Sequence, residues 1–174
     1  KGIQWPHREG DNGLKGDTRL YADGKFQTSD GKAKLIPVAF FNNNEQPCTD
    51  YPFWLNSGRV VEHFHTRTRT GKIGNCNKFS PTPYMEMNPD AAAELGIAEG
   101  DKVKVETVSG AIEARAWLSK GIRKTAVFVP IGWDQHQPFH PAPTVNYLTG
   151  VKLDPISQQP NLKVHLCRVS RMSQ

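Results

Sequence analysis

The chain has 174 residues, enough for one domain with a hydrophobic core, with or without an arm, and too few for a large multidomain enzyme. It contains 22 lysines and arginines against 17 aspartates and glutamates, and the resulting net charge of +5 suits an anionic ligand. A free nucleic-acid-binding protein usually concentrates more positive charge on one face, so the composition argues against that class.

The cysteines and the apolar runs limit the possibilities further. Cys48, Cys76 and Cys167 are far apart and include no C-x-x-C pair, so they cannot assemble a zinc knuckle or an iron-sulfur cluster locally. Their odd number favours a reducing compartment, and therefore the cytoplasm over the periplasm. No apolar run approaches the roughly 20 residues of a membrane span. Because the first residues, KGIQWPHREG, contain neither an initiator methionine nor a signal peptide, we expect the end of a longer polypeptide.

The first elements in chain order are an irregular arm and two strands. Residues 1–31 are dominated by glycine, aspartate and other polar residues, which predicts an arm without regular structure. Residues 33–41, AKLIPVAFF, predict a strand that Pro37 restricts to a sheet edge or a bulge. After a polar break, PFWLNSG at residues 52–58 predicts a second strand.

Residues 87–97, MNPDAAAELGI, carry the clearest local signal, that of a helix of about two turns. Asn88 suits the N-cap position, Pro89 the first helical position and Asp90 the positive end of the helix. Gly96 can end the helix in a left-handed conformation. We interpret Asn88 and Gly96 as structural.

The next segment predicts a β-hairpin with one buried face. A turn at residues 99–101, with Gly100 in a structural role, precedes apolar or small residues at positions 103, 105 and 107, and a turn at 109–110 precedes a second alternating run. TAVFVPIGW predicts a further buried strand, followed by the proline-rich loop WDQHQPFHPAP. A capped helix and several short strands predict a mainly β fold with short helices, a small closed barrel.

The stretch WLNSGRVVEHFHTRTRTGK, residues 54–72, begins in a predicted strand and suits a phosphorylated ligand. Gly58 lets the backbone approach a ligand closely, and Arg59 offers a planar fork to phosphate oxygens. Threonine hydroxyls can donate to phosphate oxygens, and the candidates are Thr66, Thr68 and Thr70. Basic side chains can balance the negative charge of the phosphates, and the candidates are Arg59, Arg67, Arg69, Lys72 and Lys163. By default, however, the run from Arg67 to Lys72 is a solvated face.

A metal pair is the alternative for the two histidines of this stretch. In an extended strand, His63 and His65 would point to one side and could be completed by His136 and His140. No acidic residue lies at a suitable spacing, and HQPFHP is predicted to be a loop rather than a rigid helix face. A histidine can also satisfy hydrogen bonds within the protein, an interpretation that applies above all to His63, or bind a phosphate group without a metal.

Two aromatic residues and one turn have alternative interpretations as well. Trp133 and Phe139 either border a substrate funnel or are exposed anchors for another domain. Asp154 and Pro155 are predicted to form a turn that positions the segment carrying Lys163.

Four segments, in the order SGRVVEHFHTRTRTGK, EMNPDAAAELGIAEGDKVKVET, NYLTG and DPISQQPNLK, closely resemble the carboxy-terminal, molybdopterin-dinucleotide-binding domain of bacterial molybdenum oxidoreductases, which include nitrate reductases and formate dehydrogenases. GIQWP and RLYADGKFQTSDGKAKL are similar to the segment that precedes this domain in assimilatory-type nitrate reductases. Ser57 stands where threonine is usual and Phe64 where tryptophan is usual. The resemblance implies a double-psi β-barrel at residues 51–174, preceded by an arm and edge strand at residues 1–50.

The resemblance also implies a cofactor, the molybdenum bis(molybdopterin guanine dinucleotide). The residues expected to bind it are Ser57, Gly58, Arg59, Glu62, His63, His65, Thr66, Thr68, Asn146 and Lys163. In the family, the protein ligand to molybdenum and the iron-sulfur cluster lie in other domains. We therefore expect no catalytic residue in this chain and, as its partner, the remainder of the catalytic subunit or a companion subunit.

The function implied by the resemblance is part of a nitrate reductase, which acts on a small anion and converts nitrate to nitrite. Formate dehydrogenase is the alternative within the family. Outside it, double-psi barrels also serve as protein-binding modules of unfoldase ATPases, although such a module has no reason to contain SGRVVEHFHT together with NYLT and QPNLK. Nucleic-acid binding ranks third, because the chain lacks an interleaved basic and aromatic surface.

Overall fold

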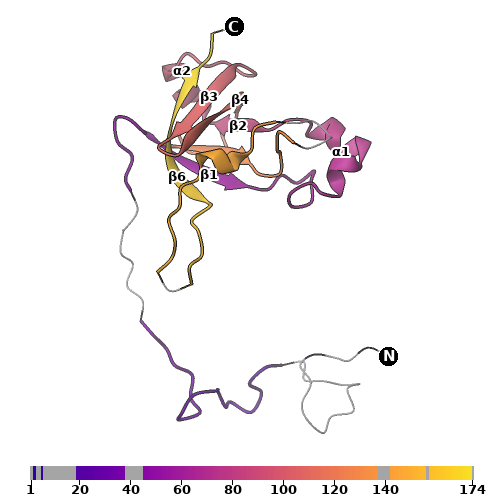
Figure 1. Ribbon diagram of the computed structural model, residues 1–174. Coiled ribbons are helices and arrows are strands. Elements are labelled where there is room, and N and C mark those ends of the chain that lie inside the picture. Colours follow the sequence, from indigo (N-terminus) through magenta and orange to yellow (C-terminus); the bar gives the residue numbers. More distant parts are fainter. Residues whose placement is uncertain are drawn as a thin grey trace. The chain divides into compact units, whose positions relative to one another are not determined.

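The computed structural model of the protein describes Gly2, Trp5 and residues 19–37, 45–136, 142–155 and 157–173. The chain divides into two compact units, Lys1–Asn43 and Asn44–Gln174 (Figure 1). The described residues of the first unit form turns and bends without a helix or strand. Within that unit, the rings of Tyr21 and Phe26 stack with their centroids 4.7 Å apart.

The predicted strand at residues 33–41 is wrong for residues 33–37, which have no regular secondary structure. A strand needs hydrogen bonds from a neighbouring strand, and none of these residues takes part in the strand pairs of the described chain. Leu35 and Ile36 are accordingly exposed. Residues 38–41 of this prediction lie outside the described residues.

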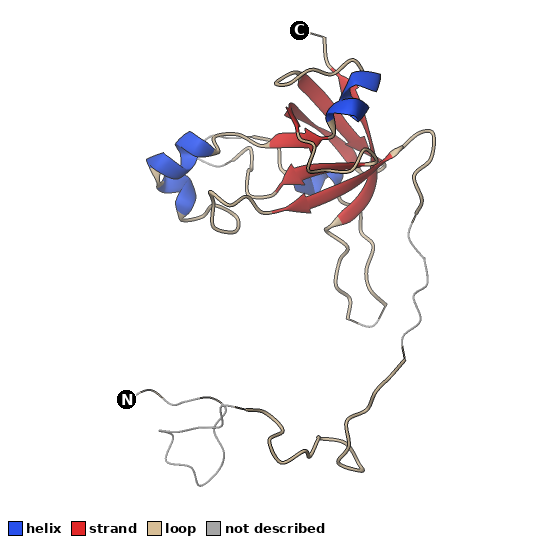
Figure 2. Cartoon of the chain, turned by 180° about the vertical axis from the view of Figure 1, so that it is seen from behind, coloured by secondary structure: helices blue, strands red, loops and turns tan. Residues whose placement is uncertain are grey.

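The second unit is built around a closed six-stranded barrel, with strand order β1-β5-β2-β4-β3-β6 (Figure 2). The strands are β1 (Phe53–Gly58), β2 (Tyr84–Met87), β3 (Lys102–Thr107), β4 (Gly110–Leu118), β5 (Ala126–Pro130) and β6 (Val164–Arg171). β1 pairs with β5 in parallel, as β2 does with β4, and the other pairs are antiparallel.

The barrel consists of two equivalent halves. Exchanging β1, β2 and β3 for β4, β5 and β6 reproduces the same cyclic strand order, and it maps the parallel pair β1·β5 onto the parallel pair β4·β2. Two interlocked three-strand halves of this kind make up a double-psi barrel. The predicted mainly β fold and its double-psi topology are therefore confirmed.

Alternating side chains fill the barrel. The hairpin of β3 and β4 buries every second residue, as predicted, and the same core receives Leu55, Met85 and Val127 from the other strands. Removing these apolar surfaces from water is the main driving force for closing the barrel. The core therefore lies inside the six strands.

The predicted capped helix is confirmed as α2 (Pro89–Glu94). Asn88 Oδ1 accepts a hydrogen bond from the backbone amide of Asp90 at 3.0 Å, which satisfies one free amide at the start of the helix. Gly96 follows with a φ of +66°, the left-handed conformation that glycine adopts at low cost.

Several elements were not predicted. These are the short strand β2, the last strand β6, the helix α1 (Gly74–Phe79) and the 3-10 helices η1 (Thr70–Lys72) and η2 (Val145–Leu148). Helix α1 buries none of its residues and therefore has no apolar face that a periodic pattern could reveal. Together with η1 it projects beside the barrel (Figure 2). In the described part of the chain, no helix is long and apolar enough to cross a membrane.

Candidate functional site

Three segments of the chain meet at one end of the barrel. Because β1 and β5 are parallel, both leave the barrel at the end where Gly58 pairs with Pro130. The amide of Ile131 donates to the Gly58 carbonyl at 2.7 Å and holds the two outgoing loops together. β6 is antiparallel to β1 and starts with Val164 opposite Asn56, so the segment before β6 arrives at the same end of the barrel.

A cleft of about 510 Å³ lies between these segments, and we call it the strand-end cleft. Six of the predicted cofactor-binding residues line it: Ser57, Arg59, His65, Thr66, Asn146 and Lys163. Sequence reasoning did not include seven other lining residues among the site residues: Ile131, Gly132, Trp133, Asp134, Thr144, Val145 and Leu162. For residues 131–134, their place at the end of the predicted buried strand was the available signal; the other three lie in or next to η2 and β6, which the sequence did not predict.

Ser57 connects β1 to the segment before β6. Its hydroxyl donates to the Leu162 carbonyl at 2.6 Å, and its backbone amide donates to the Lys163 carbonyl at 3.2 Å. Lys163 Nζ in turn donates to the Ser57 carbonyl at 3.4 Å. The predicted turn around Asp154 is present, because Asp154 Oδ1 accepts from the amide of Ser157 at 2.7 Å. Together these bonds bring Lys163 to the cleft.

Asn146 reaches the cleft through the 3-10 helix η2. Thr144 caps this helix by accepting from the amide of Asn146, at 3.4 Å. The buried hydroxyl of Thr107, in β3, donates to the Leu148 carbonyl at 3.0 Å. A Cβ at Gly110 would lie 2.6 Å from the Tyr147 carbonyl oxygen, so the close approach of η2 to the hairpin requires glycine there. The barrel thus holds η2 and Asn146 in place.

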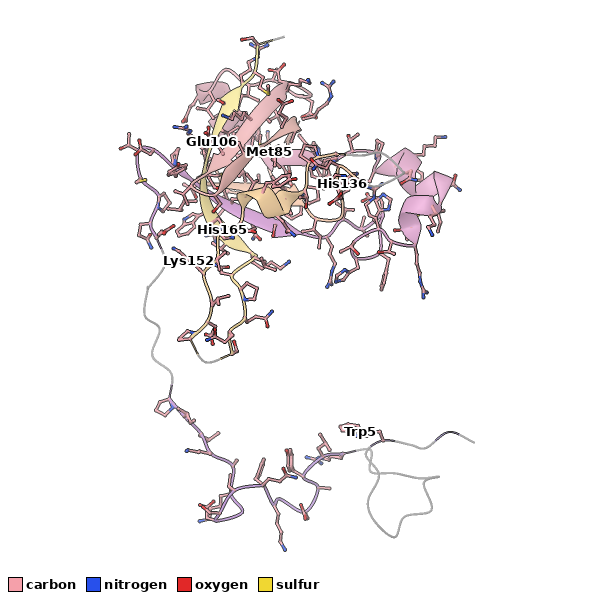
Figure 3. The ribbon with its side chains drawn as sticks, in the orientation of Figure 1. Trp5, Met85, Glu106, His136, Lys152 and His165 are labelled. Atoms are coloured by element: carbon pink, nitrogen blue, oxygen red, sulfur yellow. The ribbon has the colours of Figure 1, made fainter. Side chains whose placement is uncertain are left out.

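The loop after β1 is a series of turns rather than the extended strand on which the metal pair was based. His65 has a φ of +50°, and His63 is buried with both ring nitrogens in hydrogen bonds, Nδ1 to the Thr70 hydroxyl at 3.1 Å and Nε2 to the Ser80 carbonyl at 3.0 Å. The two rings therefore do not share one side of a strand. His136 is exposed, and His140 lies outside the described residues (Figure 3). In the described ranges, no group of three or more His, Cys, Asp or Glu residues could hold a metal ion.

Four predicted site residues lie away from the lining of the strand-end cleft. A Cβ on Gly58 would meet the Phe128 ring at 2.8 Å, so this glycine also permits packing between β1 and β5. His63 is buried as described above, whereas Glu62 and Thr68 are exposed. The Thr68 hydroxyl lies 3.2 Å from that of Thr66, which does line the cleft.

Arg67 is buried, contrary to the default prediction of a solvated face. Only 2% of its surface is exposed, and its guanidinium lies 4.4 Å from the centroid of the Trp133 ring. Its Nη2 donates to Asn77 Oδ1 at 3.0 Å. Burial lowers the pKa of the Arg67 guanidinium, because a charged group loses hydration. The chain turns at Arg67, which has a φ of +63°.

Trp133 is likewise buried and does not form an exposed anchor. Its Nε1 donates to the Pro81 carbonyl at 3.2 Å, and the His63 ring packs edge-on against it with centroids 5.8 Å apart. It therefore forms part of the wall of the strand-end cleft. Phe139, the other aromatic residue of this prediction, lies outside the described residues.

Residues 53–166 match the family model of the Molydopterin dinucleotide binding domain. The chain belongs to this family. Among its curated relatives, the F420-dependent formate dehydrogenase subunit alpha of Methanocaldococcus jannaschii is 37% identical over 98% of this chain and 24% of the relative. The assimilatory nitrate reductase catalytic subunit of Bacillus subtilis is 38% identical over 97% of this chain and 23% of the relative. The chain thus spans about a quarter of the length of these relatives.

A solved structure supports the fold independently. The acetylene hydratase from Pelobacter acetylenicus superposes with a TM-score of 0.64 at 20% identity, over 74% of this chain and 21% of that protein. Membership of the molydopterin-dinucleotide-binding family confirms the predicted domain type, and it decides against the alternative of a protein-binding barrel module. The cofactor that the family implies is the predicted molybdenum bis(molybdopterin guanine dinucleotide).

The strand-end cleft fits an anionic, hydrogen-bonding ligand of this kind. Arg59 and Lys163 supply permanent positive charges, and His65 supplies an imidazole, against the single carboxylate of Asp134. Arginine and lysine are the usual partners of phosphate oxygens, and a threonine hydroxyl such as that of Thr66 adds a short-range donor. This donor set matches the pyrophosphate and pterin groups of a molydopterin dinucleotide.

Proposed function

We propose that this chain is the cofactor-binding part of a molybdenum-dependent nitrate reductase. The supporting observation is that six residues from distant parts of the sequence line one cleft with a net positive charge: Ser57, Arg59, His65, Thr66, Asn146 and Lys163. In this role the chain does not carry out the chemistry. It holds and orients the cofactor, and the remainder of the catalytic subunit or a companion subunit completes the enzyme.

Each residue has a specific part in this proposal. Arg59 and Lys163 bind phosphate oxygens, since both are cations at the cleft. His65 and Thr66 donate hydrogen bonds to pterin or phosphate acceptors, and Asn146 can both donate and accept. Ser57 holds the segment that carries Lys163. The other predicted residues act around the cleft: Gly58 at the end of β1, Glu62 and Thr68 at exposed positions, and His63 as a buried support of the loop.

The proposed reaction is the reduction of nitrate to nitrite. One oxygen atom leaves nitrate as water, with the uptake of two protons and two electrons, and the electrons arrive through an iron-sulfur cluster in the remainder of the enzyme. When bound, the molybdenum cofactor supplies the oxygen-atom transfer. This chain contributes the positions of the pterin groups and the hydrogen bonds that tune them. We further propose a cytoplasmic location, on the basis of free cysteines at positions 48, 76 and 167.

The test is to produce this chain together with the remainder of its enzyme in cells grown with molybdate. Acid treatment of the purified enzyme should release GMP and molybdenum together. Arg59→Ala and Lys163→Ala should each lower the GMP content about tenfold, because each removes a charge-assisted hydrogen bond. Lys124→Ala is the matched control, since Lys124 pairs with Asp90 on α2 and does not line the cleft. An intact complex without GMP and molybdenum would contradict the proposal.

Formate oxidation is the second candidate, because a formate dehydrogenase subunit is 37% identical over 98% of this chain. The two activities are separated by assaying the same preparation in both directions. A nitrate reductase oxidises a reduced viologen dye only when nitrate is added, whereas a formate dehydrogenase reduces the oxidised dye when formate is added. Formate-dependent reduction alone would overturn the choice of nitrate and leave the cofactor-binding role intact.

A further inference from the structure

Arg67 joins the two walls of the strand-end cleft. One wall is the loop after β1, in which His65 and Thr66 immediately precede Arg67. The other wall follows β5 and contains Gly132 and Trp133. The guanidinium of Arg67 lies over the Trp133 ring at 4.4 Å, an attractive contact between a cation and an aromatic face. The side chain therefore spans from one wall to the other beneath the cleft surface.

The surroundings of Arg67 are fitted closely to it. A Cβ at Gly132 would lie 3.2 Å from Cγ of Arg67 and 3.3 Å from the His65 carbonyl oxygen, and Gly132 has a φ of +108°. On the other side, Asn77 links the guanidinium to the loop, because it accepts from Arg67 Nη2 and donates to the Gly71 carbonyl at 2.6 Å. The amide of Gly71 donates to the Arg67 carbonyl at 2.8 Å.

The backbone next to the cleft is in an unusual conformation. His65 and Arg67 have φ values of +50° and +63°, which cost non-glycine residues about 1 kcal/mol or more each. Such residues keep this conformation only when surrounding contacts determine it. The side-chain contacts of Arg67 with Trp133 and Asn77 are among those that hold this backbone, and Thr66 lies between the two strained residues. The direction in which His65 and Thr66 face the cleft thus depends on the buried Arg67.

We propose that Arg67 is a positioning residue of the strand-end cleft, which sets the orientation of His65 and Thr66 for binding the pterin dinucleotide. The inference rests on the proposed cofactor-binding role of the cleft. It assigns Arg67 to the support of the binding groups rather than to direct phosphate binding. A lysine cannot replace it, because an ammonium lacks the planar surface that stacks on Trp133 and the fork that reaches Asn77.

The experiment compares Arg67→Gln and Arg67→Lys with two controls in the enzyme assembled from this chain and its remainder. Arg69→Gln removes an exposed cation two positions away, and Ile112→Ala removes a buried side chain of β4 that does not line the cleft. The first readout is the GMP released by acid per mole of enzyme, measured beside the thermal unfolding midpoint. The second is hydrogen exchange in peptides that cover residues 63–66 and 131–134.

For Arg67→Gln we expect the GMP content to fall to about a tenth of the wild-type value and exchange in both peptides to become about tenfold faster. Arg67→Lys should recover less than half of the lost GMP. Arg69→Gln should change neither readout, and Ile112→Ala should lower the unfolding midpoint while GMP is retained. The proposal is overturned if GMP falls with the midpoint equally in Arg67→Gln and Ile112→Ala, or if exchange in both peptides is unchanged in Arg67→Gln. A wild-type enzyme without GMP would instead contradict the cofactor-binding role, and the exchange readout would still decide the role of Arg67.

Discussion

Ser57 and Lys163, which are 106 positions apart, lie against each other at the end of the barrel where β1 ends. The Ser57 amide donates to the Lys163 carbonyl, and Lys163 Nζ donates to the Ser57 carbonyl. The Ser57 hydroxyl adds a bond of 2.6 Å to the neighbouring Leu162 carbonyl. One small side chain at the end of β1 therefore holds the segment that supplies a cation to the cleft.

Replacing Ser57 with alanine should loosen that segment. We expect Ser57→Ala to lower the free energy of unfolding by about 1 kcal/mol, because the Leu162 carbonyl loses its donor. Urea unfolding followed by circular dichroism measures this change. Ser57→Thr keeps the hydroxyl and is the matched control, expected to unfold at nearly the wild-type urea concentration. Equal losses in the two variants would show that the hydroxyl bond does not contribute.

Gly110→Ala should displace η2 and with it Asn146. The added methyl group would lie 2.6 Å from the Tyr147 carbonyl oxygen, which belongs to the backbone and cannot rotate away. We expect a loss of about 1–3 kcal/mol in the free energy of unfolding, the usual cost of overpacking. Gly74→Ala is the comparison, since a Cβ at this first residue of α1 meets no atom within 4 Å. This second variant should be neutral or slightly stabilising, and an equal loss in both would contradict the packing argument.

The three cysteines should react with a thiol reagent at very different rates. Cys48 is exposed, Cys76 is half-buried and Cys167 is buried, where desolvation raises the pKa of its thiol to about 12. Because the thiolate is the reactive form, Cys167 should react only after unfolding. Labelling with a chromogenic disulfide at pH 8 measures the rates. Cys48→Ser should abolish the fastest phase, and rapid reaction of Cys167 in the folded protein would contradict the assigned burial.

Stability should decrease in mild acid because of His165. Its Nε2 is buried and has no hydrogen-bond partner among the described residues, and burial lowers the pKa of its imidazole below 6.5. The nearby charges of Lys152 and Glu45 act in opposite directions on this pKa. His165 and Lys152 are labelled in Figure 3. The unfolded chain therefore binds a proton more readily than the folded one, so the stabilisation is complete above pH 6.5 and declines as the pH falls towards the folded pKa.

The unfolding midpoint measured in steps from pH 8 to pH 5 tests this dependence. The His165→Gln variant cannot gain a proton at this position, so its midpoint should fall less steeply with acid than that of the wild-type protein. His136→Gln is the control, because His136 is exposed and should not alter the slope. Identical slopes for the wild-type protein and His165→Gln would rule out the contribution of His165.

Local patterns were sufficient for much of the barrel. The N-cap at Asn88, the left-handed Gly96 and the alternating residues of β3 and β4 act within a few positions of one another, so their conformations follow from neighbouring side chains. The short β2 has only four residues, and in β6 the adjacent buried residues Leu166 and Cys167 interrupt the alternation, so neither strand carries a clear period-two signal. The family resemblance then selected site residues, six of which the structure brings to one cleft.

Contacts between distant segments decided the rest. The basic stretch from Arg67 to Lys72 has a polar composition that is typical of an exposed surface, yet Arg67 is buried because Trp133 and Asn77 provide partners that no local pattern contains. His63 likewise supports the loop, because the Thr70 hydroxyl and the Ser80 carbonyl lie within hydrogen-bond distance of its two ring nitrogens. The sequence by itself predicted a small closed barrel and, through its resemblance to a known family, the double-psi type and the chemistry of the candidate binding groups. Only the tertiary structure determined which of these groups face the cleft and which hold it in shape, because burial and hydrogen bonding depend on segments that meet only after folding.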